Sequence, residues 1–87
     1  MSLEEIKAYA ESLLVQAEKY ESISAKKEQI EQSIDKAMAK GSGSAVKKLK
    51  DELTKTENQL AEIRKEIFEL LKNIRKSVSE EKNAIYY

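Results

Sequence analysis

The side chains with potential chemistry in this 87-residue sequence are carboxylates, lysines and tyrosines, because the chain has no His and no Cys. Glutamates gather at Glu28 and Glu31, and again at Glu62, Glu66 and Glu69. A di-metal site in a helical bundle needs histidine beside such glutamates, and structural zinc sites are built on Cys and His. We therefore predict no metal site, no cofactor and no small-molecule substrate, and interpret both clusters as solvated helix faces.

The tyrosines do not supply a catalytic centre either. Tyr9 and Tyr20 fall on an apolar series with helical spacing, which favours positions in a core over catalytic phenols. Nucleophilic catalysis by a thiol, or with an imidazole base, has no residues to use. No other nucleophile and base converge at a recognisable spacing. The chain is therefore predicted not to be an enzyme.

A run of five lysines without an acidic residue extends from Lys36 to Lys50. Such a run can contact phosphates, but Asp35 and Asp51 bracket it and no aromatic residue or Arg interrupts it. Over the whole chain, 16 basic residues cancel 16 acidic ones, unlike in a general polyanion binder. No apolar run approaches the ~20 residues of a membrane span, and no leader pattern opens the chain. We expect no nucleic-acid partner, no membrane span and a cytoplasmic location.

Two long helices must carry these side chains. The sequence has no Pro, is rich in Glu, Lys, Ala, Leu and Ile, and so favours helix almost throughout. Its two glycines lie together near the midpoint. We predict one domain over 1–87, with helices over 2–39 and 45–83, a loop over 40–44 and a frayed tail over 84–87. The hairpin turn is assigned to four small residues, the last of which is the expected N-cap of the second helix: Gly41, Ser42, Gly43 and Ser44.

Apolar residues recur in alternating steps of three and four along both predicted helices. Eight of ten residues in the first series and eight of nine in the second are apolar. This spacing is typical of the a/d seam of a coiled coil, and it predicts an all-α, antiparallel two-helix hairpin. The two series are Ile6, Tyr9, Leu13, Gln16, Tyr20, Ile23, Lys27, Ile30, Ile34, Ala37, and Val46, Leu49, Leu53, Thr56, Leu60, Ile63, Ile67, Leu70, Ile74.

The short loop sets the register of the pairing. Helices of equal length that fold back on each other place residues level when their numbers sum to about 85. Lys26 then lies level with Glu57, and Lys27 falls near Thr56 and Asn58 as a polar layer in the seam. A hairpin within one chain and an antiparallel swapped dimer satisfy the same register, so the sequence leaves both open.

A single seam between two helices buries few side chains completely. We therefore predict that the hairpin completes a four-helix bundle with another helical hairpin, either a different protein or its own copy. Four apolar residues outside the seam share one level and form the predicted partner interface: Leu14, Val15, Phe68 and Leu71. The alternative interpretation is that these residues only widen the edges of the seam.

The region of the turn resembles the small helical-hairpin proteins of type VII secretion, the W-x-G family. In that family a Trp-x-Gly turn is followed by small residues and an a/d-spaced helix. Gly41-Ser42-Gly43-Ser44-Ala45-Val46-Lys47-Lys48-Leu49 follows this order, with Gly41 in place of the Trp. The family's export signal, a Tyr followed four residues later by Asp or Glu, is also absent. The resemblance implies a targeting chaperone that pairs with the helical domain of a secreted effector, and export without a signal peptide.

A Gly-Ser-Gly-Ser segment is also the sequence with which engineers join two helical fragments. Under that alternative, residues 1–40 and 45–87 are pieces of a long antiparallel coiled coil from a tethering or scaffolding protein. A prefoldin-like chaperone arm is a third candidate, although the turn offers no apolar clamp beyond Met38. The sequence leaves these roles open.

Overall fold

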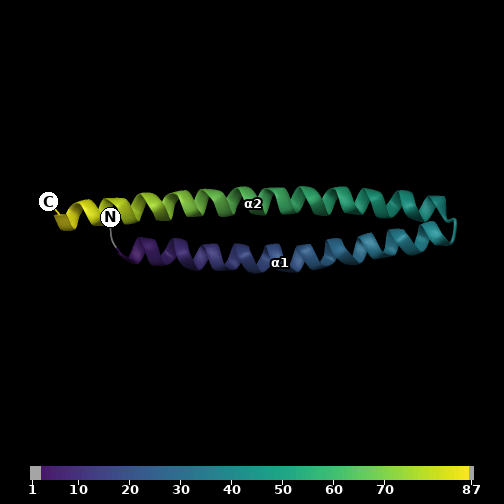
Figure 1. Ribbon diagram of the computed structural model, residues 1–87, viewed down its shortest axis with the longest axis horizontal. Helices are drawn as coiled ribbons and strands as arrows, with labels where there is room; N and C mark the ends of the chain where they lie inside the picture. Colours follow the sequence, from purple (N-terminus) through teal and green to yellow (C-terminus); the bar gives the residue numbers. More distant parts are fainter. Residues whose placement is uncertain (1–2, 87) are drawn as a thin grey trace.

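The chain forms two long antiparallel helices joined by a tight turn (Figure 1). The computed structural model describes the backbone of residues 3–86 and the side chains of residues 3–80. Helix α1 spans Leu3–Ala39 and helix α2 spans Gly43–Tyr86. The Cα trace measures 68 × 14 × 13 Å, and the start of α1 lies beside α2 at the end far from the turn. The all-α hairpin predicted from the 3,4 spacing is confirmed.

Helix α1 ends in a Schellman motif. The Ser42 amide donates a hydrogen bond to the Ala37 carbonyl oxygen, and the Gly41 amide donates one to the Met38 carbonyl oxygen, both at 3.0 Å. This pair of bonds requires a residue in the left-handed conformation just after the helix. Gly41 takes that position with φ 70°, where a side chain would be strained. A single glycine therefore stops α1 and reverses the chain.

Helix α2 begins two residues earlier than predicted. The Val46 amide donates to the Ser42 carbonyl oxygen at 3.1 Å, so Ser42 accepts the first bond of the helix, as an N-cap residue does. The predicted cap, Ser44, lies inside the first turn of α2, and Gly43 is helical rather than part of a loop. The turn is confined to residues 40–42 because Ser42 closes one helix and opens the next.

The outer ends of the helices also differ from the prediction. Residue 2, the predicted first residue of the first helix, lies outside the described residues. Helix α2 continues to Tyr86, three residues beyond its predicted end. The predicted frayed tail of 84–87 is therefore helical over its described part, and Tyr87 lies outside that part.

The two predicted series face each other between the helices, and all of their residues are at least partly buried. An ion pair joins Lys27 Nζ to Glu57 Oε1 at 3.8 Å. The numbers of this pair sum to one less than the expected 85, so the predicted register is confirmed. Lys27, rather than Lys26, forms the ion pair with Glu57. The exposed position of this pair limits its contribution to stability to about 0–1 kcal/mol, and it serves mainly to align the helices.

Two polar residues are the most deeply buried part of the seam. Thr56 is 2% exposed, and its hydroxyl donates to the Glu52 carbonyl oxygen at 2.9 Å. Ser77 is 1% exposed and extends the seam one step beyond Ile74, where the predicted series ended. The register places Ser77 level with Tyr9, and a small residue leaves room for a tyrosine ring. The seam therefore runs farther toward the termini than its apolar residues indicate.

Candidate functional site

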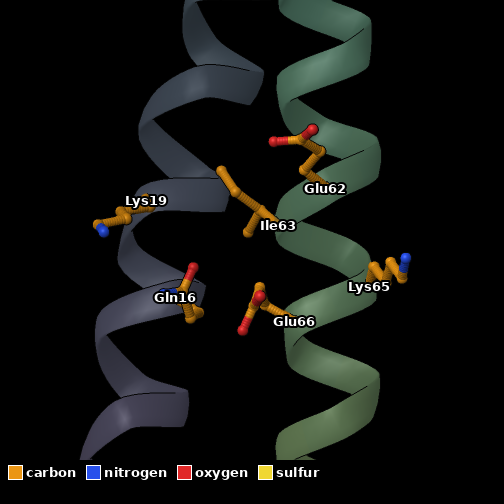
Figure 2. Close-up of a pocket in the computed structure, with 6 residues that line it drawn as sticks. All are labelled: Gln16, Lys19, Glu62, Ile63, Lys65 and Glu66. Carbon is orange, nitrogen blue, oxygen red and sulfur yellow. The ribbon is translucent and has the colours of Figure 1, made fainter.

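A groove of about 550 Å³ lies between the helices in the half far from the turn (Figure 2). Its lining comes from both helices: Gln16, Lys19, Glu62, Ile63, Lys65 and Glu66. Gln16 and Glu66 point toward each other across the gap, whereas Lys19 and Lys65 point away from it. Gln16 is a polar residue at a seam position. Pockets that bind small molecules are enclosed and mostly apolar, and this groove is neither.

The glutamates singled out in the sequence are surface residues. Glu62 and Glu66 line the groove, and Glu28, Glu31 and Glu69 are exposed. Among the residues with described side chains, no three or more His, Cys, Asp or Glu residues gather in a way that could hold a metal ion. Over the same part of the chain, neither helix has a stretch long and apolar enough to cross a membrane.

The predicted partner-interface residues all lie on the outer surface. The exposed fractions are 61% for Leu14, 48% for Val15, 65% for Phe68 and 40% for Leu71. The register brings these residues to one level, in what we call the open half (residues 3–22 and 63–80), as opposed to the turn half (residues 23–62). They do not all face the same way, however.

The hairpin has two flanks, which follow from the heptad positions a to g. Successive residues of a helix are rotated by about 100°, so positions e and b lie on one side of the a/d seam and positions g and c on the other. The groove confirms this division, because Lys19 and Glu66, both at position g, line the same hollow. Leu14 is at b and Val15 is at c, so these neighbours point to opposite flanks.

The flank at positions e and b carries nearly all of the exposed large apolar side chains, and we call it the apolar flank. Of seven such residues among the described side chains, six are at e or b: Leu3, Leu14, Met38, Phe68, Leu71 and Val78. Five of them are in the open half, where Phe68 and Leu71 also border a shallow hollow with Lys72 and Arg75. Leu3, Met38 and Val78 were not singled out in the sequence, although their shared heptad position e was a signal that could have found these exposed apolar residues.

In the turn half, the same flank carries exposed charges that are sorted by helix. Helix α1 presents acidic residues at e and b, and helix α2 presents mainly basic ones, with Glu57 the exception. The acidic set is Glu21, Glu28, Glu31 and Asp35, and the basic set is Lys47, Lys50 and Arg64. Two of these, Glu21 and Arg64, lie just inside the open half, at its border with the turn half. The flank is therefore mainly apolar near the termini, where Lys7 and Arg75 are also exposed, and mainly charged near the turn.

The turn residues have structural roles. The resemblance drawn from the sequence sets Gly41 against the Trp of the W-x-G family. The Gly41 φ of 70° is a conformation in which a bulky side chain is a rare exception. The chain therefore could not place a Trp at this position without strain. Comparison with known protein families, curated proteins and solved structures finds no match to this chain.

Proposed function

We propose that this chain is a non-enzymatic protein–protein interaction module, a helical hairpin that completes a four-helix bundle with another helical hairpin. The observation that carries the proposal is the apolar flank, on which Phe68, Leu14 and Leu71 are exposed at one level of the open half. A cluster of exposed large apolar side chains on an otherwise charged surface is typical of a site of interaction with another protein.

The shape of the hairpin supports the same function. The chain exposes 6922 Å², whereas a compact protein of 9.9 kDa exposes about 5200 Å². Its radius of gyration is 19.7 Å, compared with about 12 Å for a compact domain of this length. The excess area of roughly 1700 Å² on this one chain is about twice the ~800 Å² that each partner buries in a standard protein interface. A second hairpin along one flank would therefore cover part of the excess.

The biological role that we propose is that of a small partner protein in type VII secretion, located in the cytoplasm and exported with the effector that it binds. The resemblance at the turn and the hairpin proportions support this role. The alternative is a fragment of a tether or scaffold joined by Gly-Ser-Gly-Ser, which the rod-like length of 68 Å favours. An effector gene beside the encoding gene would favour secretion, and a natural gene without Gly-Ser-Gly-Ser would favour the joined fragment.

Light scattering of the purified chain, alone and after co-expression with the proteins encoded beside it, tests the module function. We expect a complex with the mass of two hairpins, either of the chain with itself or of the chain with a helical neighbour. A stably folded monomer at all concentrations that captures no neighbour would contradict the proposal. The variant Val15→Glu is a control, because Val15 lies outside the apolar flank and its replacement should leave the complex intact.

A further inference from the structure

We propose that a second copy of this chain packs on the apolar flank with both turns at the same end, so that the two-fold axis runs along the hairpin. This inference rests on the proposed function, to which it adds the partner, the surface and the orientation. The copy is chosen over other hairpins because the pattern of the flank complements itself in this one arrangement.

The apolar side chains of the flank favour the orientation with both turns at the same end. When both turns lie at the same end, the open half of each copy covers the open half of the other, so that Leu14, Phe68 and Leu71 meet the same apolar cluster. When fully overlapped copies point in opposite directions, Leu14 faces the copy's Glu28 and Leu71 faces the copy's Glu57. Apolar side chains would then be buried against carboxylates, which is unfavourable for both groups.

The charges of the turn half, and those of Glu21 and Arg64 at its border, favour the same orientation. In the same-end arrangement, α1 of one copy lies against α2 of the other. Residues that face each other across the two copies are then those that are level within one hairpin, with numbers that sum to about 85. Glu21 then faces the copy's Arg64, and Asp35 faces the copy's Lys50. Opposite-end packing instead places each helix against its own counterpart, and brings Arg64 against the copy's Arg64. Opposite charges across an interface select an orientation, and like charges oppose it.

Three levels of the same-end arrangement are less favourable. Val78 is level with the copy's Lys7, and Met38 is level with the copy's Lys47, so an apolar side chain meets an amine at each of these levels. Glu28 is level with the copy's Glu57, and both are acidic. Glu57 is already paired with Lys27 of its own chain at 3.8 Å, which reduces this repulsion. The two complementary levels, Glu21 with the copy's Arg64 and Asp35 with the copy's Lys50, therefore decide the orientation.

The area of the flank is sufficient for a stable dimer. Two helices side by side are about 20 Å wide, and half of the 68 Å hairpin is about 34 Å long. The open half therefore offers roughly 700 Å² per copy, close to the ~800 Å² per partner of a standard interface. The exposed side chains at intervening e and b positions are small at Ala10, Ala17 and Ala61, which allows helices to approach to the usual 8–10 Å.

Adjacent substitutions on one helix test the surface. Leu14→Glu places a charge on the apolar flank, and Val15→Glu places the same charge on the other flank. In sedimentation equilibrium we expect Leu14→Glu to weaken the dimer by at least about 30-fold, as loss of a central interface residue does. Val15→Glu should change the dissociation constant by no more than about 2-fold. Equal effects of the two variants would overturn the choice of flank.

The orientation is tested by a distance measurement that leaves the flank intact. The described residues have no cysteine, nor does the sequence as a whole, so Lys40→Cys provides a single labelling position beside the turn. In electron paramagnetic resonance, same-end packing should give a distance between the two nitroxides of about 15–30 Å, since packed helices lie 8–10 Å apart. A distance of about 60 Å or more, close to the 68 Å length, would overturn the orientation and leave the interaction module standing.

Absence of self-association is a different outcome. A chain that stays folded and monomeric at millimolar concentration would overturn the second copy as occupant of the flank. The co-expression experiment would then test whether the chain binds another protein. Failure of self-association and failure of the interaction-module function are therefore distinguishable. If Leu14→Glu lowers the helix content, the distance measurement on Lys40→Cys still decides the arrangement.

Discussion

The turn half and the open half of the hairpin share one seam pattern and differ in how well the chain itself covers it. In the turn half, Ile30, Ile34 and Leu60 are buried although only two helices are present. In the open half, the seam residues Ile6, Leu13, Ile67 and Leu70 are only partly buried. Five large apolar side chains of the apolar flank are also exposed there: Leu3, Leu14, Phe68, Leu71 and Val78. The halves differ in degree, because Val46, Leu49 and Leu53 near the turn are partly buried as well. Among the described side chains, five seam residues of the turn half are buried, and one, Ser77, in the open half.

The turn explains part of this difference. The two hydrogen bonds of the Schellman motif and the single positive φ of Gly41 hold the helices together at one end. Residues close to the turn therefore pair with little further loss of chain entropy, whereas pairing farther away closes a longer loop. Exposed charged side chains on the flank of the turn half are stabilised by hydration. The exposed apolar side chains of the open half gain no such stabilisation from water.

The largest contrast is expected from the same truncation made in each half. Leu60→Ala removes a side chain that is 4% exposed, and should lower the free energy of unfolding by about 2–4 kcal/mol. Leu70→Ala removes a partly buried side chain of the open half, and should lower it by about 1–2 kcal/mol at low protein concentration. Urea unfolding followed by circular dichroism measures both. Equal losses in the free energy of unfolding for the two variants would show that the halves do not differ in how well the seam is packed.

The next contrast concerns the two glycines of the turn. Gly41→Ala puts a side chain at φ 70°, and should lower the free energy of unfolding by about 1–2 kcal/mol. Gly43→Ala is the control, because Gly43 has ordinary helical φ and open space around its Cα. It should raise the free energy of unfolding by about 0.4–1 kcal/mol. The same sign for both variants would mean that the turn does not depend on the left-handed residue.

A smaller effect, of opposite sign, is expected in the seam at Thr56. Thr56→Val replaces a buried hydroxyl that donates to a helix carbonyl with a methyl group, and should raise the free energy of unfolding by about 1 kcal/mol. Thr54 makes the same type of hydrogen bond, to the Lys50 carbonyl oxygen at 3.1 Å, but is exposed. Thr54→Val should therefore change stability by less than about 0.5 kcal/mol. Loss of stability in Thr56→Val would assign a structural role to the hydroxyl.

The smallest effect is expected at the ion pair. Glu57→Gln removes the partner of Lys27 in a pair that is substantially exposed, and should lower the free energy of unfolding by less than about 0.5 kcal/mol. The difference from the wild type should vanish at 1 M NaCl, where charges are screened within about 3 Å. A loss above 2 kcal/mol would show that this pair stabilises the turn half rather than aligning it.

The sequence predicted the fold almost completely, because a 3,4-spaced apolar series on both sides of two glycines allows few other arrangements. The start of α2 was placed two residues late, because a second glycine is typical of a loop. Ser42 is in fact the N-cap residue of α2, and Gly43 already belongs to the helix. Ser77 was missed because a buried serine does not continue an apolar pattern. Both errors concern residues whose role is set by their hydrogen bonds or their neighbours across the seam.

The predicted interface stays a prediction, and the structure shows only how its residues are arranged. Apolar residues outside the seam identified Leu14, Val15, Phe68 and Leu71, and grouping them by level put Val15 with residues of the opposite flank. Sorting by heptad position separates Val15 and adds Leu3 and Val78. The proposed partner is a second molecule, and the sequence of one chain bears on it only through the distribution of apolar and charged residues on the surface.

Hydrogen–deuterium exchange at two protein concentrations tests most directly whether the open half is completed by a partner. At low micromolar concentration, we expect backbone amides of the open half to exchange much faster than those of the turn half. Raising the concentration should slow exchange mainly in the open half, around Leu14 and Phe68, because the second copy covers it. Equal protection of the two halves, unchanged by concentration, would contradict the account.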